Sequence, residues 1–187
     1  MTTDSEGPWE KEFQRCVDFH GHACPGLAMG YVAAKTAMAW LGEHRAADEE
    51  IVAIVETDAC GADAVQVLTG CTFGKGNFIF KDFGKNAFSF LSRATGKGIR
   101  LCAKPNALPR SPEYRTLWER VAAGKASRAE AERFAELQRA RTKEVLGTAG
   151  PDLYDLKEVH MPLPPRARIL GSSPCSRCGE WTMDSRL

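Results

Sequence analysis

The stretch Phe19-His20-Gly21-His22-Ala23-Cys24-Pro25-Gly26 is the point around which the rest of the chain is organised. Pro25 suits a first helical turn, and an apolar stripe with helical spacing follows it: Leu27, Tyr31, Ala34, Met38 and Leu41. Side chains at i and i+2 of an extended segment point the same way, so His20 and His22 can face one centre. Imidazole and thiolate groups are preferred zinc ligands. The loop therefore predicts half of a metal or thiol site, with Cys24 as its sulfur.

The second half of that site is expected from Cys60 and Cys71. A β-branched run at 51–55 predicts an interior strand, and a helix is expected at 62–69. Cys24 and Cys60 each stand just before a helix, where the unpaired N–H groups and the helix dipole stabilise an anion. We therefore expect both thiols to have lowered pKa values.

Two carboxylates flank Cys60 and receive different interpretations. Asp58 stands at the end of the predicted strand, where it could hold a histidine in one tautomer. Asp63 stands in the first turn of the next helix and is interpreted as a helix cap. The sequence leaves open whether His20 or His22 is the ligand, and favours His22 because it lies closer to Cys24.

The glycine-rich loop at 70–76 differs from a phosphate-binding P-loop. Three residues rather than four separate Gly70 from Gly74, and Gly76 replaces the Ser or Thr that binds magnesium. Lys75 stays a candidate contact for an anionic substrate. Beyond this loop we expect a half-buried strand at 77–82, a hairpin turn at 83–86 and a return strand at 87–92, then another strand at 99–103.

The C-terminal part predicts a helical hairpin followed by a zinc half-site. One helix is expected from Ser111-Pro112 to Gly124, and a second from the capping box at 127–130 to about Leu146. A proline-rich link at 161–165 and a short strand at 166–170 follow. Cys175-Ser176-Arg177-Cys178-Gly179 then supplies two sulfurs of a tetrahedral zinc site.

The other two ligands of that half-site are not evident, because the nine residues after Cys178 include no Cys or His. They could come from His160, Cys102 or another subunit. The remaining alternatives are that the chain has been cut short or that the half-site is empty.

Composition restricts the class of protein. A chain of 187 residues suits one main domain with an appendage, and its net charge of +1 favours neither nucleic acid nor a membrane surface as a partner. No apolar run of membrane-spanning length and no secretory signal is evident, so a cytoplasmic location is expected. In a reducing cytosol, seven cysteines point to metal binding or thiol chemistry rather than to disulfides.

Three of these motifs together resemble the FmdE family, which is named after a component of formylmethanofuran dehydrogenase: the stretches at 19–26, 58–66 and 69–77, supported by Lys81-Asp82-Phe83-Gly84-Lys85. The resemblance covers about residues 13–103 closely. It implies an α+β core, an intertwined homodimer, a metal site built from the His and Cys motifs, and association with a molybdenum or tungsten enzyme. Longer members carry a C-terminal treble-clef zinc finger, of which Cys175 and Cys178 match the first pair and the second pair is absent.

The expected fold class is α+β, a mixed sheet with packed helices, a helical hairpin and a C-terminal treble-clef-like zinc knuckle. The expected division is a flexible tail (1–12), an α+β core (13–104), a helical hairpin (105–160) and a linker with a partial zinc-finger element (161–187).

The leading hypothesis is an accessory or stand-alone metal-binding protein that holds zinc, or another transition metal. Its expected ligands are His20, His22, Cys24, Cys60, Cys71, Cys175 and Cys178. The alternative is a thiol-dependent or metal-dependent enzyme acting on a small substrate, with Cys60 or Cys24 as the nucleophile and His22 as its base. A third hypothesis is an interaction module that docks a partner protein through the C-terminal knuckle.

Overall fold

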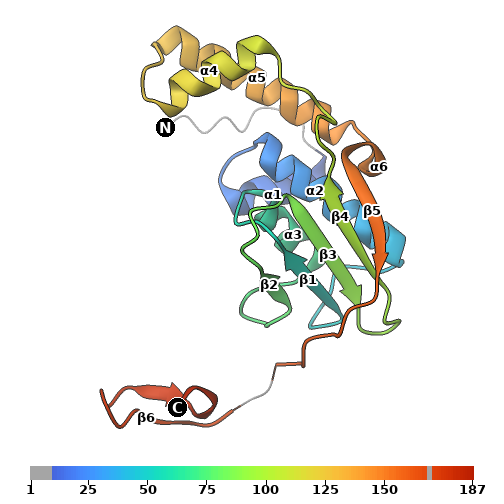
Figure 1. Cartoon of the computed structure of the whole chain (residues 1–187), viewed down its shortest axis with the longest axis vertical. Helices are drawn as coiled ribbons and strands as arrows, with labels where there is room; N and C mark the ends of the chain where they lie inside the picture. Colours follow the sequence, from blue (N-terminus) through green and yellow to red (C-terminus); the bar gives the residue numbers. More distant parts are fainter. Residues whose placement is uncertain (1–9, 168–169) are drawn as a thin grey trace.

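The computed structural model describes residues 10–167 and 170–187, which form a mixed α+β fold (Figure 1). The elements of the core sheet layer are α1 (Lys11–His20), α2 (Pro25–Leu41), β1 (Ile51–Val55), α3 (Gly61–Thr69), β2 (Phe78–Phe80), β3 (Ala87–Ser92) and β4 (Gly98–Ala103). The later elements are α4 (Pro112–Ala122), α5 (Arg128–Leu146), α6 (Gly150–Leu153), β5 (Tyr154–Val159), β6 (Ser172–Pro174), β7 (Trp181–Met183) and the 3₁₀ turn η1 (Asp184–Arg186). No helix in the described part of the chain has the length and apolar character needed to cross a membrane.

Strand β1 is interior to the five-stranded sheet, whose order is β2-β1-β3-β4-β5. All five of its residues are buried, as its unbroken apolar run predicts. Helix α3 connects β1 to β2, and the two strands are parallel, because a parallel pair needs such a crossover. Helices α1, α2 and α3 gather on one face of this sheet (Figure 1).

The hairpin expected at 77–92 is wrong. Strand β2 pairs with β1 and does not pair with β3, which lies on the other side of β1. The turn at 83–86 instead passes across the end of β1, where Lys85 N donates to Glu56 O over 2.9 Å and Glu56 N donates to Ala87 O over 3.0 Å. The true hairpin is β3–β4, which turns at Gly96.

The segment assigned to a helical hairpin ends in a strand that the sequence pattern did not predict. Helices α4 and α5 begin at Ser111 and Ser127 as expected, and Ser127 forms a capping box with Glu130. Residues 154–159 then form β5, which pairs with β4 at the edge of the sheet. Its outward Asp, Lys and Glu residues are typical of an edge strand, and they hid its apolar alternation.

The linker at 161–167 returns across the sheet face opposite the helices. Leu163 packs against a small cluster that includes Val52, Ile54 and Leu91. Arg93 fastens this crossing because it donates to Pro164 O over 2.8 Å. The short strand expected at 166–170 falls partly on residues 168–169, outside the described chain, and residues 166, 167 and 170 lie in no strand.

An ion pair fixes the end of β1 near the loop that leads to Cys60. The Glu56 side chain is 9 % exposed and accepts two hydrogen bonds of 2.8 Å from Arg100 of β4. The Arg100 guanidinium holds the pKa of Glu56 below its ordinary value of 4.5. A carboxyl whose folded-state pKa is lowered stabilises the fold above its unfolded pKa, and this contribution is lost as pH falls through the folded pKa.

Arg100→Met is therefore expected to lower the free energy of unfolding by about 2 kcal/mol at pH 7, because it leaves a buried carboxylate unpaired. The deficit should shrink as the pH falls below 4.5, where Glu56 becomes protonated. Urea denaturation at both pH values measures this. Arg128→Gln, which breaks an exposed pair with Glu132, is the control and should change stability by less than about 0.5 kcal/mol. An equal deficit at both pH values would contradict the assignment.

Candidate metal centre

The loop between α1 and α2 places its three predicted ligands together. Gly21 ends α1 in the left-handed conformation (φ 95°), and its N–H donates to Val17 O over 2.7 Å. Cys24 caps α2, with its Sγ accepting a hydrogen bond from Leu27 N over 3.3 Å. The turn is so short that one ligand atom from each of His20, His22 and Cys24 lies within 4.8 Å of the others.

His20 has one oriented nitrogen and one unused nitrogen. Its Nδ1–H donates to Asp63 Oδ2 over 2.7 Å, and its side chain is 14 % exposed. The Nε2 atom is buried and has no hydrogen-bond partner within the described residues. The Asp63 carboxylate fixes the tautomer in which Nε2 carries a lone pair, the arrangement that a metal-binding histidine commonly has. A buried nitrogen without a partner is unfavourable unless another group occupies the position.

His22 completes the imidazole pair from a more exposed position. Its ring centroid lies 4.6 Å from that of His20, with an angle of 39° between the ring planes. The side chain of His22 is exposed, whereas those of His20 and Cys24 are half-buried. The group is therefore open to solvent on the His22 side.

Cys60 brings a second sulfur to Cys24. A Cβ atom added to Gly26 would lie 3.6 Å from Cys60 Sγ and 3.9 Å from Cys24 Sγ, so both sulfurs line one point. Burial raises the pKa of Cys24 to about 11, and the neighbouring Cys60 raises it further against the hydrogen bond from Leu27 N. The expectation of a lowered pKa at Cys24 is therefore wrong, because desolvation exceeds the effect of the helix start. A bound cation would favour the thiolate again.

A close approach of two helices sets the distance between these thiols. Cys24 and Cys60 precede α2 and α3, and the two helices touch at Gly30 and Gly61. A Cβ atom added to Gly30 would lie 2.6 Å from the Gly61 carbonyl carbon. Side chains larger than hydrogen would hold the helices apart and separate their N-terminal ends.

Cys71 and Lys75 lie away from this group. Cys71 is fully buried in the core, and its thiol donates to Ile51 O over 3.3 Å. Lys75 donates to the carbonyl oxygens of Ala47 and Asp48, at 3.5 and 3.0 Å. The structure thus gives Cys71 a packing position and Lys75 a loop-tethering position, and it brings neither to the three-residue group.

Asp63 is the site residue that sequence reasoning missed. Asp58, the residue expected to orient a histidine, is exposed after β1, whereas Asp63 contacts His20 from the first turn of α3. An acidic residue three positions after Cys60 was the available signal. It was interpreted as a helix cap because its contact with α1 depends on tertiary packing.

The second cysteine pair lies in the β6–β7 hairpin. Gly179 N donates to Cys175 O over 2.8 Å, and the backbone N–H groups of Cys178 and Arg177 lower the pKa of Cys175. In the described residues, no His, Cys, Asp or Glu joins both sulfurs in a group of three within 4.8 Å. The zinc-finger element therefore stays a prediction.

Comparisons with known proteins agree with the motifs. The model of the FmdE family, described as "FmdE, Molybdenum formylmethanofuran dehydrogenase operon", matches residues 19–155. A crystal structure of an FmdE-like protein of tungsten formylmethanofuran dehydrogenase, from Syntrophus aciditrophicus, is similar, with a TM-score of 0.62 and 27 % identity. That comparison covers 99 % of this chain and 92 % of the other.

A relative from Archaeoglobus fulgidus, named a probable S-adenosyl-L-methionine-binding protein, is 33 % identical over 180 residues. The match covers 92 % of this chain and 49 % of the relative. The chain thus spans about half the length of that relative.

Proposed function

Because the chain belongs to the FmdE family, we propose that it is a metal-binding protein, accessory to another enzyme or acting alone. Its core holds one transition-metal ion, zinc by preference. The ligands are His20 and His22 with Cys24 and Cys60, and Asp63 orients the first of them.

The observation that carries this proposal is the buried Nε2 atom of His20, which has no partner within the described residues. Asp63 holds the opposite nitrogen, so the free lone pair points into the group formed with His22 and Cys24. A cation at that point would bind Nε2 and lower the pKa of the Cys24 thiol. Two imidazoles and two thiolates form a tetrahedral set that suits zinc, with cobalt as a spectroscopic substitute.

The family relation also supports three proposals about context. We propose that the chain forms a homodimer in the cytoplasm and associates with components of a molybdenum or tungsten enzyme, as the name of the Syntrophus aciditrophicus protein suggests. The Cys175–Cys178 pair is proposed as half of a second zinc site.

A second candidate function is a metal-dependent or thiol-dependent enzyme acting on a small substrate. The exposed position of His22 favours it, because a substrate could approach the ion from that side. In this alternative Cys60 is the nucleophile and His22 its base. The name of the Archaeoglobus fulgidus relative adds S-adenosyl-L-methionine as a ligand to test.

Metal titration of a Cys175→Ser/Cys178→Ser variant tests the proposal, because that background removes the second cysteine pair. We expect about one zinc ion per chain, with a Kd of about 50 nM or tighter in competition with a chromophoric chelator. Cobalt substitution should give thiolate-to-cobalt charge-transfer absorption. A double variant that retains no metal and shows no cobalt–thiolate absorption would contradict the proposed centre.

A further inference from the structure

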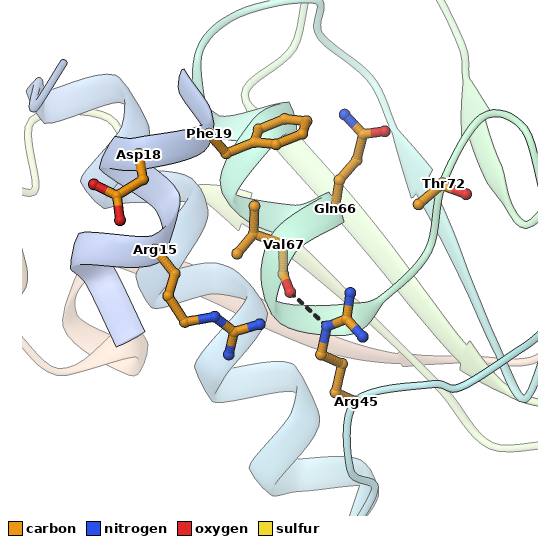
Figure 2. A pocket seen from close by; sticks show the side chains of 7 residues that line it. All are labelled: Arg15, Asp18, Phe19, Arg45, Gln66, Val67 and Thr72. Carbon is orange, nitrogen blue, oxygen red and sulfur yellow. Dashed lines mark hydrogen bonds between the residues drawn. The ribbon is translucent and has the colours of Figure 1, made fainter. Parts of the chain in front are cut away.

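A pocket of about 380 Å³ lies between α1, α3 and the loops at 43–50 and 70–77 (Figure 2). Its size is that of small-molecule sites. The residues of interest in its lining are Arg15 and Phe19 of α1, Gln66 and Val67 of α3, and Arg45 and Thr72. The pocket adjoins the metal centre, since Phe19 precedes His20 and Gln66 follows Asp63 by one helical turn. None of its lining residues is a proposed metal ligand.

Arg45 is positioned before any ligand arrives. Its Nε–H donates to Val67 O over 2.9 Å, in the last turn of α3, where the negative end of the helix dipole favours a cation. A Cβ atom added to Gly70 would lie 3.2 Å from Arg45 Cγ, so the side-chain stem runs over that glycine. Within the described residues, the two terminal amino groups of Arg45 have no hydrogen-bond partner.

A second guanidinium reaches the same space from α1. In Figure 2 the ends of Arg15 and Arg45 point toward each other. Arg15 forms no ion pair within the described part of the chain. Asp18, the one acidic residue of the lining, accepts a hydrogen bond from Gln14 over 2.8 Å and points away from Gln66 and Thr72 in Figure 2. The pocket therefore has an excess of positive charge, which an anion would neutralise.

The opposite wall of the pocket is apolar. Phe19 is 59 % exposed, and its ring extends over the pocket toward Gln66 in Figure 2. Val67 adds aliphatic surface. A ligand with an apolar body would cover this ring and remove it from water. The amide of Gln66 and the hydroxyl of Thr72 stand between the apolar and cationic walls and can donate hydrogen bonds.

We propose that this pocket binds a small organic anion. Its carboxylate or phosphate group is held by Arg15 and Arg45, and its apolar body lies against Phe19 and Val67. The two guanidinium groups supply paired N–H donors for the oxyanion, and the aromatic wall selects against a bare inorganic ion. The proposal goes beyond metal binding, because its residues and its ligand differ from those of the metal centre.

Calorimetric titration of the whole chain with benzoate and phenyl phosphate tests the proposal and distinguishes the two anion types. We expect at least one of them to bind at least tenfold more tightly than inorganic phosphate and than uncharged benzyl alcohol. Arg15→Gln and Arg45→Gln should each weaken that binding about tenfold or more, because each removes a charge-assisted hydrogen bond. Phe19→Ala should also weaken it.

Arg128→Gln is the matched control, because it removes one positive charge from an exposed position on α5 and should leave binding unchanged. Arg15 is exposed, so Arg15→Gln should keep the fold even if Arg45→Gln disturbs the Val67 contact; circular dichroism checks both variants. His20→Ala should bind the anion normally, so failure of the metal proposal and failure of this one are distinguishable. Absence of binding by both anions would overturn it, as would equal binding of benzyl alcohol or inorganic phosphate, or unchanged affinity in Arg15→Gln.

Discussion

Gly30→Ala is expected to lower the free energy of unfolding by about 3 kcal/mol and to abolish binding of the core metal. The added Cβ would meet the Gly61 backbone, including its carbonyl carbon at 2.6 Å. Backbone atoms cannot rotate away as a side chain can, so α2 and α3 must separate. Those helices carry Cys24 and Cys60 at their starts, and their separation would spread the two sulfurs. Urea denaturation and metal analysis measure the two effects.

The control for this substitution is Gly74→Ala, because a Cβ atom at Gly74 has no neighbour within 4 Å. Its effect on stability should stay within about 0.5 kcal/mol, with metal content unchanged. A Gly30→Ala protein as stable as the wild type, with full metal content, would show that the helices do not need this contact.

His20→Ala and Cys24→Ser are expected to weaken zinc affinity by a factor of about 100 or more in the Cys175→Ser/Cys178→Ser background. Each removes one of four proposed ligands. Asp63→Asn should weaken zinc binding by about 10 to 100-fold, because it removes the carboxylate that orients His20. Chelator competition measures all three affinities.

Two substitutions test whether the structure distinguishes ligands from bystanders. Asp58→Asn should leave zinc affinity unchanged, since Asp58 is exposed and Asp63 contacts His20. Cys71→Ala should lower stability but keep the metal, because the Cys71 thiol is fully buried and bonded to Ile51 O. Loss of metal in Cys71→Ala with retention in His20→Ala would reverse the assignment.

Local signals predicted most of the helices and the central strand. Pro25 and Gly42 bound α2, Ser127 opens α5, and the continuous apolar run at 51–55 is a strand buried on both faces. Each signal acts within one turn or one strand, so its consequence can be recognised from neighbouring residues. The mixed α+β class followed from these elements.

Features that depend on distant partners were not predictable in the same way. The apolar pattern of β2 is compatible with pairing to either β1 or β3, and the crossover through α3 decides between them. Asp63 and Cys71 have equally ambiguous residue types. A carboxylate at a helix start can cap or can orient a histidine, and a cysteine can be a ligand or a small core residue. Only the packing of distant elements, such as α1 against α3 at Asp63, distinguishes them.

Zinc-edge X-ray absorption of the zinc-loaded Cys175→Ser/Cys178→Ser protein tests the proposed centre most directly, because it counts nitrogen and sulfur ligands. The account predicts two imidazole nitrogens at about 2.0–2.1 Å and two sulfurs at about 2.3 Å, with one imidazole lost in His20→Ala. A zinc ion coordinated by oxygen and nitrogen alone, or a first shell unchanged in His20→Ala, would contradict it.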